Sequence, residues 1–109
     1  MQLPFDTFDN LLWWMFVASR GGQMRMKILN YLLGSPANAN RLAEELGINY
    51  RTVTHHLEIL VQNGLVVAEG PKYGRVYFPS PLLLQGIKSY RNVVSLLNKG
   101  KEKKMSGVE

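Results

Sequence analysis

The sequence predicts a mainly α-helical domain with one small β hairpin. Two short amphipathic helices joined by a tight turn occupy residues 38–63. A glycine-rich strand–turn–strand pattern follows over residues 65–78, and longer apolar helices flank this core over about residues 6–19 and 81–98. A chain of 109 residues has the size of one domain, so we expect a single folded unit over residues 1–98.

The apolar fraction, the lack of cysteine and the net charge limit which class of protein this can be. The apolar fraction of 46% is enough for a core. The absence of cysteine excludes disulfides and thiolate metal sites and fits a reducing compartment, so we expect a cytoplasmic protein. The net charge of +5 and the pI near 9.7 favour an anionic partner, either nucleic acid or a membrane surface. Charge alone fits a merely soluble basic protein equally well.

The first helix of the central pair has clear start and stop signals. Asn38 can cap it, because its side-chain oxygen can accept from an unpaired backbone N–H. Leu42 and Leu46 lie four residues apart and give the helix one apolar face, with Ala43 beside them. Gly47 follows, where a left-handed residue ends a helix without a Cβ clash.

The second helix of the pair, residues 50–63, is capped by Asn49 and has two different faces. Its apolar stripe at helical spacing consists of Val53, Leu57, Leu60 and Val61. The side chains off the stripe are polar, and the first of them lie at the helix N-terminus: Tyr50, Arg51, Thr54, His55 and Glu58. In helix-turn-helix proteins, this end of the second helix is directed at base edges in the major groove.

These residues resemble the winged helix-turn-helix core of ArsR-type transcriptional regulators. The resemblance is carried by Leu42–Ile48, Thr52–Leu60 and Gly64–Val66, and it extends to Arg25–Leu32 upstream and Tyr73–Phe78 downstream. It covers roughly residues 23–80. It implies a winged-helix fold and a homodimer that binds double-stranded DNA sequence-specifically to regulate transcription.

The hairpin is the expected wing of this fold. Leu65–Glu69 has strand-forming residues, Gly70–Gly74 forms the turn, and the return strand covers residues 75–78. Lys72 at the tip and the adjacent Arg75 are candidate phosphate contacts, although cations on an isolated turn are more often simply solvated. The predicted DNA-binding residues are Tyr50, Arg51, Thr52, Thr54, His55, Lys72 and Arg75.

The flanking helices predict dimerisation. Residues 11–18 are apolar on every side but too short to span a bilayer. One face can pack on the domain, so the other would meet a second subunit, an apolar ligand or a membrane. Ser80 and Pro81 start the last helix. Its apolar residues Leu83, Ile87, Tyr90, Val94 and Leu97 are spaced four, three, four and three residues apart and form a seam. Such a seam can pack against either a partner helix or the helix's own domain. The resemblance implies that both helices form the dimer, through Leu12, Trp13, Phe16, Leu83, Ile87, Tyr90, Val94 and Leu97.

Two further segments complete the predicted organisation. Residues 23–33 form a helix that directs Arg25 and Lys27 outward. Its predicted core side consists of Ile28, Leu29, Leu32 and Leu33. Residues 99–109 form a lysine-rich tail that we expect to be disordered.

No catalytic constellation or cofactor motif can be assembled, so we expect no enzyme activity and no cofactor. His55 and His56 are adjacent, so on a helix they point about 100° apart and cannot grip one metal ion together. ArsR-type metal sensors use cysteines, or His and carboxylate pairs on the last helix. This chain has neither, so the family's metal sensing does not carry over.

Two alternatives to a DNA-binding regulator remain open. One is a winged helix used only for protein–protein contact, against which the cations at Arg51, Lys72 and Arg75 argue. The other is a membrane-associated or lipid-sensing regulator, suggested by the aromatic run at residues 13–16. The operator, the direction of regulation and any small-molecule effector are left open by the sequence.

Overall fold

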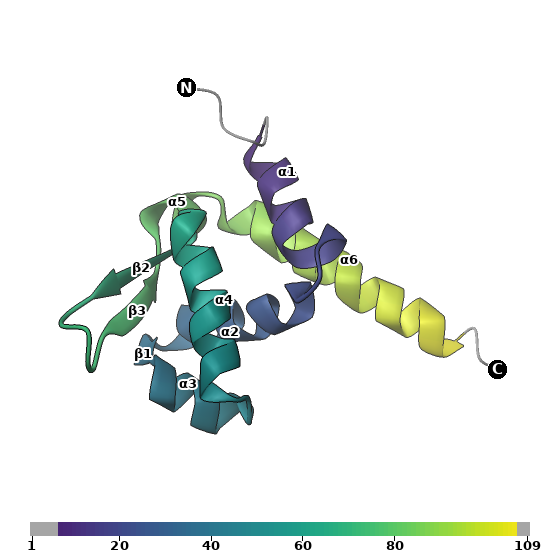
Figure 1. The fold of residues 1–109 in the computed structure, drawn as a ribbon. Helices are drawn as coiled ribbons and strands as arrows, with labels where there is room; N and C mark the ends of the chain where they lie inside the picture. Colours follow the sequence, from purple (N-terminus) through teal and green to yellow (C-terminus); the bar gives the residue numbers. More distant parts are fainter. Residues whose placement is uncertain (1–6, 107–109) are drawn as a thin grey trace.

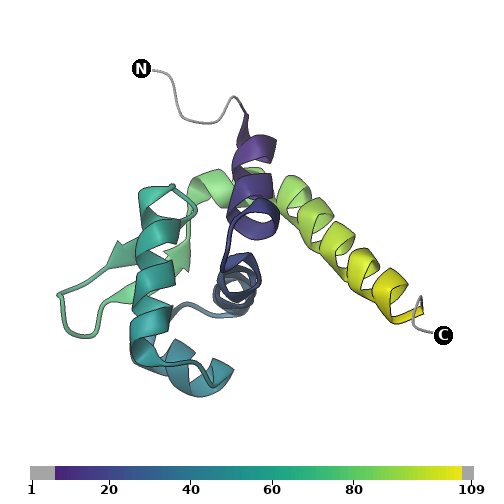
Figure 2. The ribbon, with the colours of Figure 1, turned by 45° about the vertical axis from the view of Figure 1, so that its right-hand side comes forward.

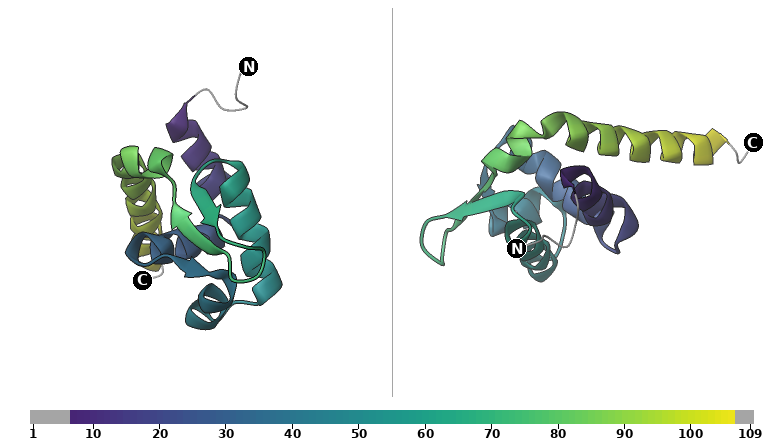
Figure 3. Two further views of the ribbon diagram at one scale, coloured as in Figure 1. Left: turned by 90° about the vertical axis from the view of Figure 1, so that its left-hand side faces the viewer. Right: turned by 90° about the horizontal axis from the view of Figure 1, so that it is seen from above.

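The computed structural model describes residues 7–106, with side chains described for residues 7–98. The molecule measures 50 × 38 × 22 Å. A helical body lies at the centre, and the wing and the last helix project from it in opposite directions (Figure 1; Figure 3, right). This mainly helical fold with a small antiparallel sheet is the predicted fold class.

The N-terminal helix begins close to the predicted position. Helix α1 covers Phe8–Trp13 and continues directly into one π-helical turn, η1, over Trp14–Ala18. Thr7 caps α1 by accepting a hydrogen bond from the backbone N–H of Asn10 at 3.0 Å. Asp6, where the predicted range starts, lies outside the described residues.

Helix α2, Gly22–Gly34, confirms the helix predicted over residues 23–33 but corrects one of its residues. Ile28, Leu29 and Leu32 are buried as expected, and Lys27 is exposed. Arg25, however, is only 3% exposed and points into the protein, so its outward placement was wrong. Backbone carbonyls of η1 and the following loop accept from its guanidinium, an arrangement that hydrophobic periodicity does not reveal.

The central helix pair forms as predicted. Helix α3 covers Ala39–Leu46 and α4 covers Tyr50–Gln62. Asn38 accepts from the Arg41 N–H at 2.8 Å, and Asn49 accepts from the Arg51 N–H at 2.8 Å. Gly47 ends α3 in the left-handed conformation with φ of 65°. The predicted apolar stripe of α4 is buried except for Val61, which is 37% exposed.

The hairpin is part of a three-stranded sheet, one strand larger than predicted. Strands β2, Val66–Glu69, and β3, Val76–Pro79, form the antiparallel wing beside α4 (Figure 2). The additional strand β1, Ala37–Asn38, pairs with the other edge of β3, giving the order β1-β3-β2. The wing is therefore hydrogen-bonded to the chain at the start of α3.

The last helix is broken, contrary to the prediction of one helix over residues 81–98. Ser80 caps α5, Pro81–Gln85, by accepting from the Leu83 N–H at 3.0 Å. The chain then breaks at Gly86 and continues as α6, Ile87–Ser106. A Cβ on Gly86 would clash with the ring of Phe8, so the absence of a side chain lets α1 approach this break. Helix α6 also runs past residue 98, where the sequence predicted a disordered tail; residues 107–109 lie outside the described range.

Four residues predicted for the dimer surface belong to the core of the subunit. Tyr90 is 1% exposed, donates a hydrogen bond to Asn30 Oδ1 at 2.6 Å and stacks edge-on against Phe16 with ring centroids 5.2 Å apart. Leu12 and Leu83 are fully buried. The seam of the last helix therefore packs on its own domain at Leu83 and Tyr90. The predicted interface is corrected at four buried positions: Leu12, Phe16, Leu83 and Tyr90.

Candidate nucleic-acid interface

The starts of α3 and α4 and the tip of the wing surround one shallow hollow. Its volume is about 60 Å³. None of its lining residues is acidic, and two of them, Lys72 and Arg75, are cationic. The lining consists of Asn38, Ala39, Asn40, Tyr50, Thr54, Lys72, Gly74, Arg75 and Tyr77.

The structure brings together four of the seven residues predicted to bind DNA. Tyr50 and Thr54 from α4 line the hollow together with Lys72 and Arg75 from the wing. Arg51 is exposed next to this group.

The remaining two predicted residues lie apart from the hollow. Thr52 is half-buried. His55 is exposed on another side of α4, where it lines a different hollow with Arg20 and Arg25.

Local hydrogen bonding favours an anion at this surface. The N-terminal ends of α3 and α4 both reach the hollow, and a helix N-terminus carries partial positive charge. Asn38 and Asn49 each satisfy one backbone N–H of the first turns. Other N–H groups of a first turn have no intrahelical acceptor and are free for phosphate oxygens.

Three residues of this surface were missed by the sequence reasoning. Asn40 and Tyr77 line the hollow, and Tyr73 at the wing tip is 88% exposed. A polar residue in the first turn of a helix and an aromatic residue in a glycine-flanked turn are weak signals in sequence. Pairing of β1 with β3 brings Tyr77 next to the start of α3.

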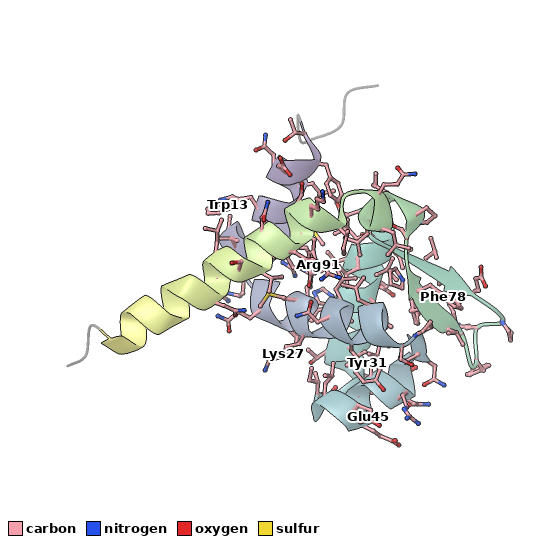
Figure 4. The ribbon with its side chains drawn as sticks, turned by 180° about the vertical axis from the view of Figure 1, so that it is seen from behind. Trp13, Lys27, Tyr31, Glu45, Phe78 and Arg91 are labelled. Atoms are coloured by element: carbon pink, nitrogen blue, oxygen red, sulfur yellow. The ribbon has the colours of Figure 1, made fainter. Side chains whose placement is uncertain are left out.

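Exposed apolar side chains also occur on α1, η1 and α6. Trp13 is 50% exposed, Trp14 is 42% exposed and Leu96 is 56% exposed. Of the predicted interface residues, Ile87, Val94 and Leu97 are half-buried, packing partly on their own domain. Trp13 lies near α6 in the view from behind (Figure 4).

Two classes of site were also searched for in the described part of the chain. No group of three or more His, Asp or Glu side chains there could hold a metal ion. No helix within residues 7–106 is long and apolar enough to cross a membrane.

The helix-turn-helix segment is similar to a known family. Residues 22–67 match the family model described as bacterial regulatory protein, arsR family. This segment is ArsR-like, and the chain has a winged helix-turn-helix fold. The family is one of transcriptional regulators, and no catalytic activity is indicated by the comparisons. None of the curated proteins is similar enough to count as a relative of this ArsR-like chain.

Solved structures share its fold at low identity. HlyU from Vibrio cholerae is 18% identical with a TM-score of 0.60, over 89% of this chain and 96% of that one. The PcaV transcriptional regulator from Streptomyces coelicolor is 18% identical with a TM-score of 0.67, over 89% of this chain and 70% of its own. A homodimeric winged helix-turn-helix DNA-binding domain from Mycobacterium bovis, a possible ArsR-family regulator, is 17% identical with a TM-score of 0.52, over 96% and 95% of the two chains.

Proposed function

We propose that this ArsR-like protein is a cytoplasmic homodimeric regulator that binds double-stranded DNA sequence-specifically. The observation that carries the proposal is the hollow shared by the helix-turn-helix and the wing. It gathers Lys72, Arg75 and two helix N-termini on one surface without an acidic lining residue. Phosphate contacts of this kind provide affinity and fix the register of a protein on DNA.

Helix α4 is the recognition helix in this proposal and enters the major groove by its N-terminal half. Exposed Arg51 reaches a guanine O6 and N7 edge, and half-exposed Tyr50 contacts a neighbouring base or sugar. Thr54 donates to the Arg51 carbonyl at 3.0 Å, so its methyl group is the part available to a thymine methyl. Thr52 contacts phosphate near the helix start, and His55 contacts the far edge of the site.

The wing holds the phosphates that flank the groove. Lys72 and Arg75 are exposed, and β1–β3 pairing fixes the hairpin relative to α3. Exposed Tyr73 at the tip packs against sugar beside these contacts. The wing is therefore expected to contribute affinity for all sequences more than preference for one.

We propose a dimer through the apolar surface of α1, η1 and α6. Exposed Trp13 and Leu96 supply apolar area that a single subunit leaves uncovered, and half-buried Ile87, Val94 and Leu97 border it. Helix α6 projects beyond the body of the subunit and so offers a long surface for a partner helix (Figure 1). The homodimeric domain from Mycobacterium bovis, which has the same fold, supports this assembly.

Selection of bound duplexes from a random pool tests the proposal. A two-fold dimer reads half-sites about 34–36 Å apart, so the selected sequences should contain an inverted repeat with that spacing. Enrichment of a single, non-repeated site would contradict the dimer. Failure to enrich any sequence above a library without protein would contradict DNA recognition and favour a protein–protein module.

A further inference from the structure

A hollow larger than the one beside the wing lies against another side of α4. Its volume is about 590 Å³. It is enclosed by α4, the end of η1 and the loop over residues 19–21. Cationic or imidazole side chains of its lining are Arg20, Arg25, His55 and His56, whereas Trp14 and Ile59 give it an apolar part.

The charge at the base of this hollow is not neutralised within the subunit. Arg25 is 3% exposed, and its partners are Met15 O, Ser19 Oγ, Arg20 O and His56 Nδ1, all of them uncharged or carrying only partial charge. Among the described residues, no carboxylate pairs with it, and no lining residue is acidic. A buried cation without a counter-charge is costly, so a bound anion would remove a cost that the empty site carries.

The donor inventory of Arg25 leaves room for one more acceptor. A guanidinium has five N–H groups. Nε donates to Met15 O at 2.9 Å, Nη2 donates to Ser19 Oγ and Arg20 O, and Nη1 contacts His56 Nδ1 at 3.3 Å. One N–H of Nη1 therefore remains for a ligand, and Arg20, which is exposed, can supply a second cation at the opening.

The apolar part of the lining argues for an organic body on this anion. Trp14 presents an aromatic ring and Ile59 a branched aliphatic chain beside the cationic groups. Ligand sites for small molecules commonly have volumes of about 300–1,000 Å³ and combine apolar walls with a few polar groups. A carboxylate on an aromatic ring matches both the cationic groups and the apolar wall, and benzoate is a minimal probe of this class.

We propose that this hollow binds a small organic carboxylate and that the bound ligand weakens DNA binding. The second half rests on the proposed function, because it takes α4 as the recognition helix. His55, His56 and Ile59 place the ligand directly against α4. A negative charge there repels the DNA phosphates, and His55 can no longer serve ligand and DNA together. By linkage, DNA must weaken ligand binding by the same factor.

Calorimetric titration without DNA tests the site itself. Benzoate should bind once per subunit with a Kd below about 1 mM. Benzamide, which has the same shape without the charge, should bind at least about tenfold more weakly, because the contact to Arg25 requires an anion. Absence of benzoate binding would overturn the site. Inorganic phosphate binding as tightly as benzoate would overturn the organic ligand.

Two substitutions test the location without removing Arg25, whose hydrogen bonds hold the loop. Arg20→Glu puts an acid at the opening and should weaken benzoate at least about tenfold. Lys27→Glu makes the same change of net charge on the exposed face of α2, outside the lining, and should bind as the wild type does. Equal losses in both variants would show only a general effect of charge and would contradict this site.

Measuring the affinity of the protein for the selected duplex at increasing benzoate concentrations then tests the coupling between ligand and DNA binding. DNA affinity should fall in the wild type, and Arg20→Glu should need at least about tenfold more benzoate for the same fall. If benzoate binds but leaves DNA affinity unchanged, the regulatory half is wrong and the site stands. If no duplex is selected while benzoate still binds, the proposed function fails independently of the site.

Discussion

Arg25 Nη1 lies 3.3 Å from Nδ1 of His56, and this contact joins α2 to α4. The guanidinium donates, so the imidazole accepts at Nδ1 and carries its proton on Nε2. Protonation of Nδ1 would place two cations against each other in a buried site. The pKa of His56 is lowered by its burial first, and further by Arg25 and His55.

This pair predicts that stability falls as the solution is acidified. The pKa of His56 is lower in the folded state than its usual value near 6.5, so the unfolded chain binds the proton more readily. The stabilisation is fully present above about pH 6.5 and is lost as pH falls toward the folded-state pKa. The melting temperature, measured between about pH 7.5 and 5.5, should therefore decrease with acid, and it should decrease less in His56→Asn.

The exposed neighbour provides the control for this prediction. His55→Asn removes a histidine from the same turn of α4 without touching the Arg25 contact. It should keep most of the wild-type dependence on pH, because His55 makes the smallest of the three contributions to the lowered pKa of His56. An unchanged slope in His56→Asn would show that other groups cause the acid sensitivity.

Local chemistry explains which parts of the fold could be predicted. Asn38, Asn49 and Ser80 cap their helices as expected, because a cap depends on residues only a few positions away. The burial of Arg25 and the two-residue strand β1 could not be predicted, because each depends on a carbonyl or a strand distant in sequence.

The candidate site likewise combines features that local sequence predicts with features that depend on residues distant in the chain. The polar face of α4 follows from helical spacing. The convergence of Asn40, Lys72 and Tyr77 requires the sheet that connects α3 to the wing. Likewise, the seam that includes Tyr90 has the spacing of a dimer helix, but the same spacing suits its actual packing against Phe16.

The contact between Phe8 and Gly86 predicts a coupled loss of stability. Gly86→Ala would push a methyl group into the Phe8 ring and should lower the free energy of unfolding by about 1–3 kcal/mol. In a Phe8→Ala background the same substitution should cost less, since the ring is gone. Denaturant titration of the two single variants and the double variant measures the difference. If the losses in free energy of unfolding of the two single variants simply add up in the double variant, the contact between Phe8 and Gly86 is not the cause.

Arg51 is predicted to discriminate between sequences. Arg51→Ala should reduce the preference for the selected duplex over a random duplex by about 1–3 kcal/mol, because a base contact is lost while most phosphate contacts remain. Both affinities are measured at one salt concentration. Arg91→Ala, which removes an exposed arginine of α6 (Figure 4), is the matched control and should keep the preference. Equal losses on both duplexes would make Arg51 a phosphate contact.

The wing is predicted to contribute affinity for DNA duplexes of any sequence. Lys72→Ala combined with Arg75→Ala should weaken every duplex and reduce the slope of log affinity against log salt by about two units per subunit. The control pair Lys27→Ala and Lys88→Ala removes the same charge from exposed positions on α2 and α6. A slope that changes equally in both pairs would reflect net charge and not contact.

Leu96 is predicted to lie in the dimer contact. Leu96→Glu changes a side chain that is 56% exposed in the subunit, so the fold should survive. It should nevertheless produce monomers, because a carboxylate would be buried without a partner across the interface. Light scattering at micromolar concentration compares it with Val67→Glu, which alters an exposed apolar residue of β2. A monomeric wild type, or dimers in both variants, would refute this surface.

The central claim is that the surface formed by α4 and the wing lies on DNA. The chain has no cysteine, so Tyr73→Cys creates a unique attachment point at the wing tip for an iron chelate that cleaves nearby DNA. On the selected duplex, we predict cleavage at two positions, one outside each half-site. Lys27→Cys, labelled in the same way on α2, should leave the duplex intact. Cleavage from Lys27→Cys with none from Tyr73→Cys would contradict the account.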